Sequence, residues 1–293
     1  MQNKIQKLMV SKMNFKETYS KKIEFIDNYI GEYLDSLTGI EPKLHDALKY
    51  AVLGGGKRLR SILCTEICTM LGGDINDALP YATAIELIHA YSLVHDDLPS
   101  MDNADMRRGM PSCHKKYGEG FAVLTGDGLL NLAFETMTKA CLKNNDLLSV
   151  QAMDAVGRAS GIFGMVNGQA VDLKLASKKD ATEADLIGLI EQKTMALIKA
   201  AIISGAIMSG CSEETLAELD KYAYHLGLAF QIRDDFEDEI QDEDESDSPN
   251  FINILGREQA QEKLSYHSRI AYDIISKYGE DSFLCEFHKF LFD

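Results

Sequence analysis

The chain has 293 residues and is strongly acidic, with 30 basic and 46 acidic side chains and a formal net charge of −16. This charge disfavours nucleic-acid binding, which needs a basic face, while a hydrophobic content of 45% indicates a folded core. No segment approaches ~18 uninterrupted apolar residues, and the N-terminus lacks the apolar stretch of a secretory signal. We therefore expect no membrane span and a cytoplasmic location.

Apolar residues recur with a helical period nearly everywhere, and no useful strand-like alternation stands out. The span 112–248 contains no proline, which favours helices over turn-rich β structure. We expect an all-α protein of roughly ten or more helices, given their usual mean length. It should form one domain over residues 1–293, with residues 1–40 as a peripheral N-terminal segment.

The first basic segment follows a run of three glycines, in the sequence GGGKRLR. It is expected to place Lys57 and Arg60 on one face of a helix that begins after a flexible turn. A helix N-terminus with added cations can bind an anion. A solvated, basic helix start is an equally good interpretation of this segment alone.

A second helix, expected from about Pro80, ends in the first acidic cluster. Ile85, His89, Ser92 and Asp96 are spaced to lie along one line of it. The cluster continues through the sequence DDLPSMD and is soon followed by two adjacent arginines.

A third helix, expected from about Ser212, carries an apolar stripe that ends in the second acidic cluster. The stripe consists of Leu216, Leu219, Ala223, Leu226 and Phe230, and the next step lands on Asp234. Ser212 is a plausible N-cap, and Thr182 with Asp185 matches a capping box for an earlier helix.

Two carboxylate clusters at the ends of apolar stripes predict a bound metal, since an uncompensated buried carboxylate is costly. Oxygen-only ligands favour a hard cation, most naturally Mg²⁺, which is usually completed by substrate phosphates. The clusters therefore indicate an enzyme that acts on a phosphorylated small molecule.

The ordered motifs resemble the short-chain trans-isoprenyl diphosphate synthases, most closely the bacterial farnesyl diphosphate synthases. The resemblance runs from about Lys43 to at least Leu255. It is carried by GGGKRLR, IELIHAYSLVHDDLPSMDNADMRRGMPSCHKKYG, TGDGLL, NGQAVDL, QKTMALIKAA and GLAFQIRDDFED. It implies the isoprenoid synthase fold, a helical bundle around a central cavity, as a homodimer that binds isopentenyl diphosphate and an allylic diphosphate.

The resemblance also implies roles for individual residues. Three Mg²⁺ ions per active site would be held by Asp96, Asp97, Asp102, Asp234, Asp235 and Asp238, with Asp97 in a supporting role. The allylic diphosphate would be bound by Arg107, Lys193, Thr194 and Gln231. Isopentenyl diphosphate would be bound by Lys57, Arg60, His89 and Arg108. Gln169 and Asp172 would line the cavity and orient the lysine, and Asp96, Asp102, Lys193 and Asp234 would be the catalytic residues.

Product length in this family depends on residues just before the first aspartate motif. Tyr91 stands five positions before Asp96, followed by Ser92, and the motif contains the two extra residues Pro99 and Ser100. This matches the bacterial farnesyl pattern and implies a fifteen-carbon product, made by head-to-tail condensation of isopentenyl diphosphate with dimethylallyl or geranyl diphosphate. A geranylgeranyl diphosphate synthase is the alternative.

The sequence departs from the family pattern after the second motif. A glycine-rich loop and a lysine are expected there, whereas this chain has EIQDEDESDSPNFINILG, with Ser248 near the position of the lysine. Met195 replaces a small residue, and Ala104 replaces an acid. These changes leave open a non-catalytic subunit of a larger prenyl synthase.

A di-iron carboxylate bundle is a further alternative. It needs two copies of Glu-x-x-His, and Glu86 with His89 supplies only one.

Overall fold

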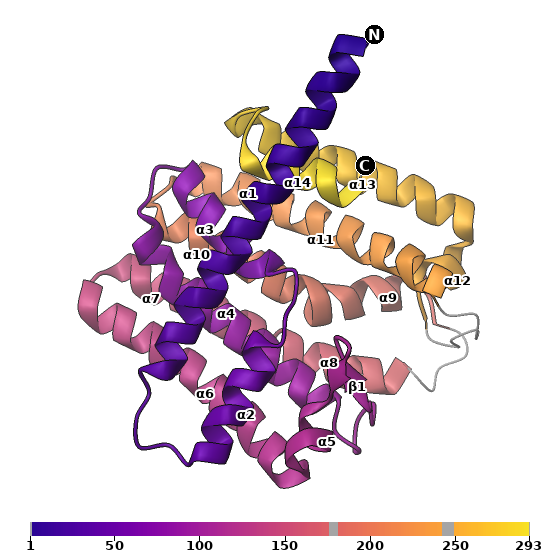
Figure 1. Ribbon diagram of the computed structural model, residues 1–293. Coiled ribbons are helices and arrows are strands. Elements are labelled where there is room, and N and C mark those ends of the chain that lie inside the picture. The colour runs from indigo at the N-terminus through magenta and orange to yellow at the C-terminus, as the bar shows by residue number, and fades with distance from the viewer. Residues whose placement is uncertain (1, 176–180, 242–248, 293) are drawn as a thin grey trace.

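The computed structural model describes residues 2–175, 181–241 and 249–292, and these form an all-α bundle (Figure 1). The elements of the N-terminal half are α1 (Gln2–Asp35), α2 (Pro42–Leu53), α3 (Leu59–Met70), α4 (Ile75–Asp96), β1 (Met106–Arg107), β2 (Met110–Pro111), α5 (Cys113–Tyr117), α6 (Glu119–Asn144) and α7 (Leu147–Ser160). Then follow α8 (Met165–Leu175), α9 (Glu183–Ile190), the π-helical turn η1 (Glu191–Met195), α10 (Ala196–Met208), α11 (Glu213–Gln241), α12 (Phe251–Leu255), α13 (Arg257–Ile275), the 3₁₀ turn η2 (Ser276–Tyr278) and α14 (Phe283–Phe292). The predicted fold class is confirmed.

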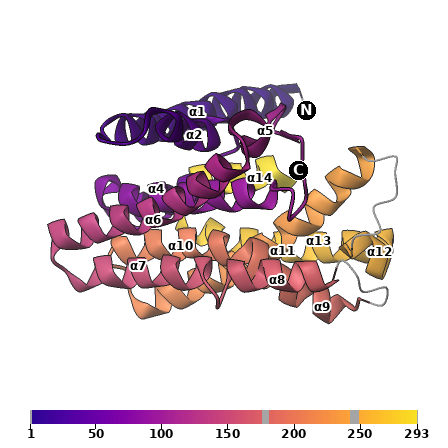
Figure 2. The ribbon, with the colours of Figure 1, turned by 90° about the horizontal axis from the view of Figure 1, so that it is seen from below.

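Helix α4 is the centre of the bundle. It packs against α3, α6 and α10, and Tyr81, Ile85 and Leu87 are completely buried on it. Figure 2 shows α1 and α2 as an outer layer above α4 and α6, with α7, α8, α10 and α11 below them. A helix that is apolar on nearly all sides must be enclosed in this way. The end of α4 is thereby held firmly inside the protein.

The start of α4 differs from the prediction. The helix begins at Ile75, because the Asp74 side chain accepts a hydrogen bond from the Asn76 backbone amide at 2.9 Å and caps the first turn. Pro80 lies inside the helix, so the start expected near Pro80 is wrong. The capping box of Thr182 and the N-cap at Ser212 are confirmed.

The start of α3 also differs. Arg58 adopts a left-handed backbone conformation, with φ 45°, and α3 begins only at Leu59. Lys57 therefore lies in the loop before the helix rather than on the helix with Arg60, and that part of the prediction is wrong.

A short antiparallel hairpin, β1–β2, follows the first acidic cluster, although no strand was expected from the sequence. Arg108 and Gly109, which connect its strands, both have positive φ, 53° and 75°. Such a two-residue turn suits the right-handed twist of a hairpin.

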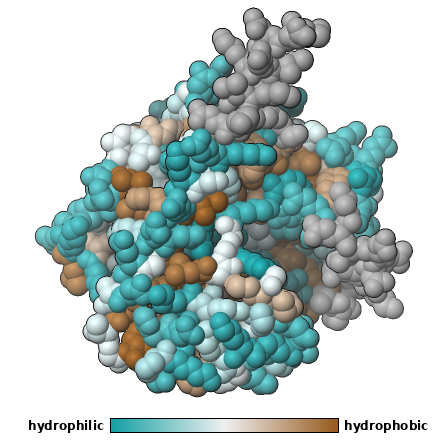
Figure 3. All heavy atoms as spheres, in the orientation of Figure 1, coloured by the Kyte–Doolittle hydropathy of each residue, from teal (hydrophilic) through white to brown (hydrophobic). Residues whose placement is uncertain are grey.

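The ends of α4 and α11, the loop before α3 and the hairpin meet on one side of the bundle. Figure 3 shows that this face is hollowed, with hydrophobic residues visible inside the hollow. Among the described helices, none combines the length and the apolar character needed to cross a membrane.

Candidate active site

The first aspartate motif folds back on itself directly after α4. The Asp102 backbone amide donates to the Asp96 carbonyl at 2.9 Å, and the Asn103 amide donates to the Leu98 carbonyl at 3.1 Å. This turn brings Asp102 beside Asp96. The pKa of Asp96 is raised to about 6, mainly by burial and also by the nearby charge of Asp102, while Lys193 opposes the shift. The positive charge of Lys193 therefore does not fully compensate the Asp96 carboxylate.

Asp97 points elsewhere. Its carboxylate is buried and accepts hydrogen bonds from Arg107, through Nε at 3.0 Å and also through Nη2. Arg107, on β1, is thereby held next to the first motif, and burial together with this pairing ties the hairpin to α4. In this arrangement Asp97 orients an arginine, and its supporting role at a metal stays a prediction.

Lys193 lies on the π-helical turn η1 and forms an ion pair with Asp172 of α8. The turn can approach α8 closely because residue 168 is glycine: a Cβ there would lie 2.4 Å from the Lys193 backbone nitrogen. The expected pairing of Asp172 with the lysine is seen. Gln169 lies on the same helix as Asp172, and Thr194 follows Lys193 within the π-helical turn.

The second aspartate motif ends the long helix α11. Asp234 accepts a hydrogen bond from the neighbouring Arg233 at 2.7 Å, and burial raises its pKa. Asp235 is buried and accepts hydrogen bonds from Gln231 at 3.0 Å and from the Phe251 backbone amide at 2.8 Å. Burial raises the pKa of Asp235 to about 6. Asp235 thus connects α11 to the first turn of α12.

The predicted isopentenyl diphosphate residues form a second group, rich in cations. Arg108 donates to the Gly55 carbonyl and approaches His89, with 3.5 Å between its Nη2 and the His89 Nε2. Burial keeps the pKa of His89 well below its usual value, and the charge of Arg60 lowers it further. Arg60 is half-buried, and its Nε is shielded from solvent with no hydrogen-bond partner among the described residues. A guanidinium with an unused, shielded donor is suited to an anionic ligand.

Lys57 extends the cation group towards the second motif. Its Nζ lies 3.8 Å from a carboxylate oxygen of Glu237, and its charge lowers the pKa of Asp234. The cations therefore fall into two sets. The charges of Lys193 and Arg107 lower the pKa of Asp96, whereas Lys57 and Arg60 lie near Asp234.

The two residues expected to limit product length lie on α4. Tyr91 is buried and packs edge-on against His95, with 5.8 Å between the ring centroids. The Ser92 hydroxyl donates to the His89 carbonyl at 2.9 Å. Both therefore lie in the last two turns of α4, directly before the first motif.

The carboxylates fit a hard divalent cation. Within residues 2–175, 181–241 and 249–292, no three histidine, cysteine, aspartate or glutamate side chains are gathered closely enough to hold a metal ion. Asp96 and Asp234 are nevertheless half-buried, partial burial raises the pKa of each, and a bound cation would stabilise them as carboxylates. Asp238 and Asp102 supply further oxygen donors in the same motifs, and the acidic residues 242–248, with Ser248, lie outside the described residues.

Sequence reasoning missed the partners that hold these side chains. Arg58 and Glu86 form a buried ion pair of 3.2 Å, and Arg233 contacts both Asp234 and Glu237. The sequence pattern marks Glu86 only as a possible di-iron ligand. Its pairing with Arg58 disfavours that alternative, because the carboxylate is already compensated. No spacing rule could have linked Arg58 to a residue 28 positions away.

Known proteins similar to this chain share both its sequence and its fold. The sequence profile described as polyprenyl synthetase matches residues 41–253. The chain belongs to the polyprenyl synthetase family. The chain is 36% identical to farnesyl diphosphate synthase from Geobacillus stearothermophilus over 273 residues, which cover 89% of this chain and 91% of that protein.

Two other polyprenyl synthetase relatives extend the comparison. The chain is 41% identical, over 76% of its length, to the heterodimeric geranylgeranyl pyrophosphate synthase large subunit 2 from Arabidopsis thaliana, and it spans only 58% of that relative. The crystal structure of geranyltransferase from Legionella pneumophila superposes with a TM-score of 0.88 at 34% identity, covering 96% of this chain and 98% of that one. The resemblance to the short-chain trans-isoprenyl diphosphate synthases is confirmed, and with it the prediction of a prenyltransferase.

Proposed function

We propose that this chain catalyses the Mg²⁺-dependent head-to-tail condensation of isopentenyl diphosphate with dimethylallyl and geranyl diphosphates, giving farnesyl diphosphate and diphosphate. The observation that supports it most directly is the presence of two groups of cations close to the two aspartate motifs. One set, around Arg107 and Lys193, suits the allylic diphosphate. The other, around Lys57, Arg60, His89 and Arg108, suits isopentenyl diphosphate.

In the proposed reaction, the allylic carbon–oxygen bond to diphosphate breaks, and the double bond of isopentenyl diphosphate attacks the resulting carbon. A proton is then lost to the released diphosphate, which restores a double bond. Lys193, Arg107, Thr194 and Gln231 bind and orient the leaving diphosphate, with Asp172 holding the lysine and Gln169 lining the cavity. When bound, Mg²⁺ neutralises charge on the departing diphosphate, and Asp96, Asp102 and Asp234 would be its principal ligands, with Asp97, Asp235 and Asp238 nearby.

Apolar walls exclude water, which would otherwise capture the allylic cation. Tyr91, with Ser92 beside it, would close the floor of the tail pocket and stop elongation at fifteen carbons. Farnesyl and geranylgeranyl diphosphate synthases both occur among the relatives, so a twenty-carbon product is the second candidate.

A purified-protein assay tests the proposal. Labelled isopentenyl diphosphate is supplied with dimethylallyl, geranyl or farnesyl diphosphate in turn, and the products are separated by chain length. A fifteen-carbon product supports the proposal, whereas a twenty-carbon product supports the alternative. No turnover with any acceptor, followed by activity on mixing with a second prenyl synthase chain, would identify a non-catalytic subunit.

We also propose that the chain acts as a cytoplasmic homodimer of one catalytic domain. Large apolar side chains are exposed at the ends of α6 and α7 and in the loop that follows: Leu142, Leu147, Ile162 and Phe163. Phe163 and Val150 also line an apolar depression with Phe134 and Met153. An exposed apolar face of this kind favours a protein interface. Light scattering after size-exclusion chromatography should give twice the mass of the chain, and a monomer would refute it.

A further inference from the structure

Glu86 is a buried carboxylate that the proposed reaction does not use. It lies on α4, one turn before His89, and is 3% exposed. One carboxylate oxygen accepts a hydrogen bond from Nη1 of Arg58 at 3.2 Å, and the other accepts from the Ser61 backbone amide at 3.2 Å. Glu86 therefore joins α4 to the first turn of α3.

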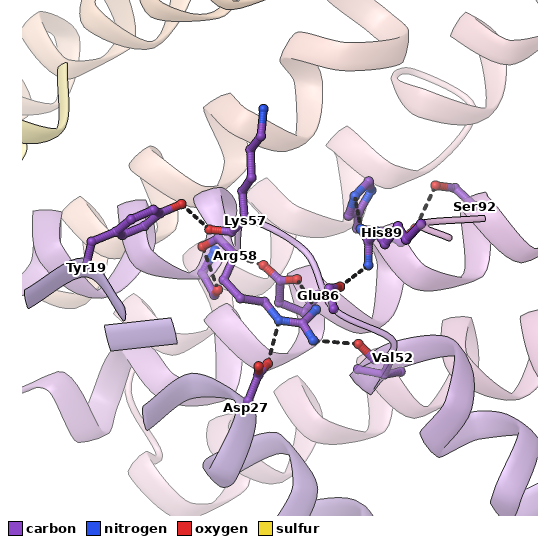
Figure 4. A network of polar contacts seen from close by, with 11 residues as sticks. Tyr19, Asp27, Val52, Lys57, Arg58, Glu86, His89 and Ser92 are labelled. Carbon is purple, nitrogen blue, oxygen red and sulfur yellow. Dashed lines mark hydrogen bonds and ion pairs between the residues drawn. The ribbon is translucent and has the colours of Figure 1, made fainter. Parts of the chain in front are cut away.

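Arg58 uses every nitrogen of its guanidinium within the protein. Besides Glu86, it donates from Nε to Asp27 of α1 at 2.6 Å and from Nη2 to the Val52 carbonyl of α2 at 2.7 Å. Figure 4 shows its side chain lying among these three partners. All three nitrogens of Arg58 are therefore engaged by the protein, and its side chain is only 2% exposed. It is turned away from the surface, although its neighbours Lys57 and Arg60 are both expected to bind a diphosphate.

The backbone around Arg58 is held in an uncommon conformation. Its φ of 45° is left-handed, which is unfavourable for a residue with a Cβ and persists only where other contacts enforce it. The carbonyl of Lys57 accepts a hydrogen bond from the Tyr19 hydroxyl, and the Ser61 hydroxyl donates to the Arg58 carbonyl at 3.0 Å. In Figure 4 the Lys57 side chain extends away from this network. The turn thus directs Arg58 inwards and Lys57 outwards.

Glu86 also compensates the positive charge of the surrounding cations. Burial lowers the pKa of Arg60, and the negative charge of Glu86 opposes that effect; the same holds for Arg108. Without this carboxylate, Arg58 would lose a buried counter-charge, and the other two arginines would repel one another with less compensation.

We propose that Arg58 and Glu86 are positioning residues for isopentenyl diphosphate, holding Lys57, Arg60 and His89 in place before the substrate binds. This rests on the proposed function. It also accounts for the single Glu-x-x-His pattern of the sequence: the histidine faces the ligand, and the glutamate holds the turn that supplies the ligand's other cations.

The test is a comparison of Michaelis constants in Glu86→Gln, which keeps the shape of the side chain and removes its charge. We expect the KM for isopentenyl diphosphate to rise at least tenfold, while kcat and the KM for geranyl diphosphate stay within twofold. Calorimetric titration with isopentenyl diphosphate alone should show the same loss of affinity without any turnover. Glu66→Gln is the matched control. Like Glu86, Glu66 of α3 pairs with a cation on another segment: its partner is Lys22 of α1, at 2.6 Å, away from the site.

A double variant, Arg58→Met with Glu86→Leu, separates positioning from stability. Replacing a buried ion pair by apolar residues often leaves stability unchanged or increases it. We therefore expect the melting temperature to stay near that of the wild type while the KM for isopentenyl diphosphate remains raised. This variant carries the test if Glu86→Gln does not fold.

Recovery of a wild-type KM in the double variant would overturn the inference, as would an unchanged KM in Glu86→Gln. A fall in kcat together with similar rises in both Michaelis constants would also overturn it, because this pattern would indicate a general disturbance of the protein. A wild-type chain that neither binds nor consumes isopentenyl diphosphate would overturn the proposed function, and this inference with it.

Discussion

Gly126 of α6 lies against the last turn of α4. A Cβ at this position would lie 2.0 Å from Nε2 of His95, the residue directly before Asp96. His95 cannot easily move aside, because its ring packs against Tyr91 and its Nε2 lies 3.2 Å from the Val123 carbonyl. Gly126→Ala should therefore push α4 and α6 apart at the first aspartate motif.

The magnitude can be isolated with Gly128→Ala in the same helix, where the new Cβ would meet only Leu48 at 3.5 Å, an ordinary contact. Replacing glycine by alanine inside a helix stabilises a protein by roughly 0.5–1 kcal/mol, and this gain is common to both variants. Overpacking costs about 1–3 kcal/mol and applies to Gly126→Ala alone. The two variants should thus differ by about 1–3 kcal/mol in the free energy of unfolding.

Urea unfolding followed by circular dichroism measures this difference. Gly128→Ala should unfold at a higher urea concentration than the wild type, and Gly126→Ala at a lower concentration than Gly128→Ala. The kcat of Gly126→Ala should also fall, because the displaced His95 disturbs the last turn before Asp96. Coincident unfolding curves for the two variants would refute the reasoning.

Three further predictions concern catalysis, product length and acidity. Asp96→Ala or Asp234→Ala should lower turnover by orders of magnitude while the circular dichroism spectrum is retained. Chelation with EDTA should abolish the wild-type reaction until Mg²⁺ is restored. Near-normal rates in either experiment would refute the metal assignment. Tyr91→Ala should open the tail pocket and give products longer than fifteen carbons, and an unchanged product would mean that another residue sets the limit. Burial lowers the pKa of His288 to about 4, against about 6.5 unfolded, so the unfolded chain binds more protons between these values and this histidine's contribution to stability is lost as the pH falls from about 6.5 towards 4. His288→Gln should remove about 2 kcal/mol of that acid-dependent loss, measured by urea unfolding at pH 7 and pH 4.5, and an equal pH dependence in both proteins would contradict it.

Sequence periodicity was enough to predict the all-α class and the two helices that end in acidic clusters, but not where α3 and α4 begin. The stripe on α11 is buried at Leu219, Ala223 and Leu226, as its spacing predicts, and it does lead to Asp234. The spacing succeeds here because every residue involved belongs to one helix, in which position along the chain determines direction.

Contacts between helices could not be predicted in the same way. Asp97 pairs with Arg107, and Asp235 accepts a hydrogen bond from the first residue of α12, although as sequence they look equivalent to their neighbours Asp96 and Asp234. Adjacent residues on a helix point about 100° apart, so the two carboxylates of each pair meet different surroundings. Which surroundings each of them meets depends on tertiary packing. The left-handed turn at Arg58 likewise carries no local signal, because glycine is absent there.

The π-helical turn from Glu191 to Met195 makes the direction of Lys193 depend on a single residue. A π-turn is equivalent to an α-helix with one residue inserted, and each residue turns an α-helix by about 100°. Deleting Gln192 would allow α9 and α10 to join as one regular helix. The side chains before the deletion would then be rotated relative to those after it. As a result, α10 could keep its place in the core only if Lys193 turned away from Asp172. The direction of the Lys193 side chain therefore depends on the number of residues in the turn. Substitutions at neighbouring positions would not reproduce the rotation that a deletion causes.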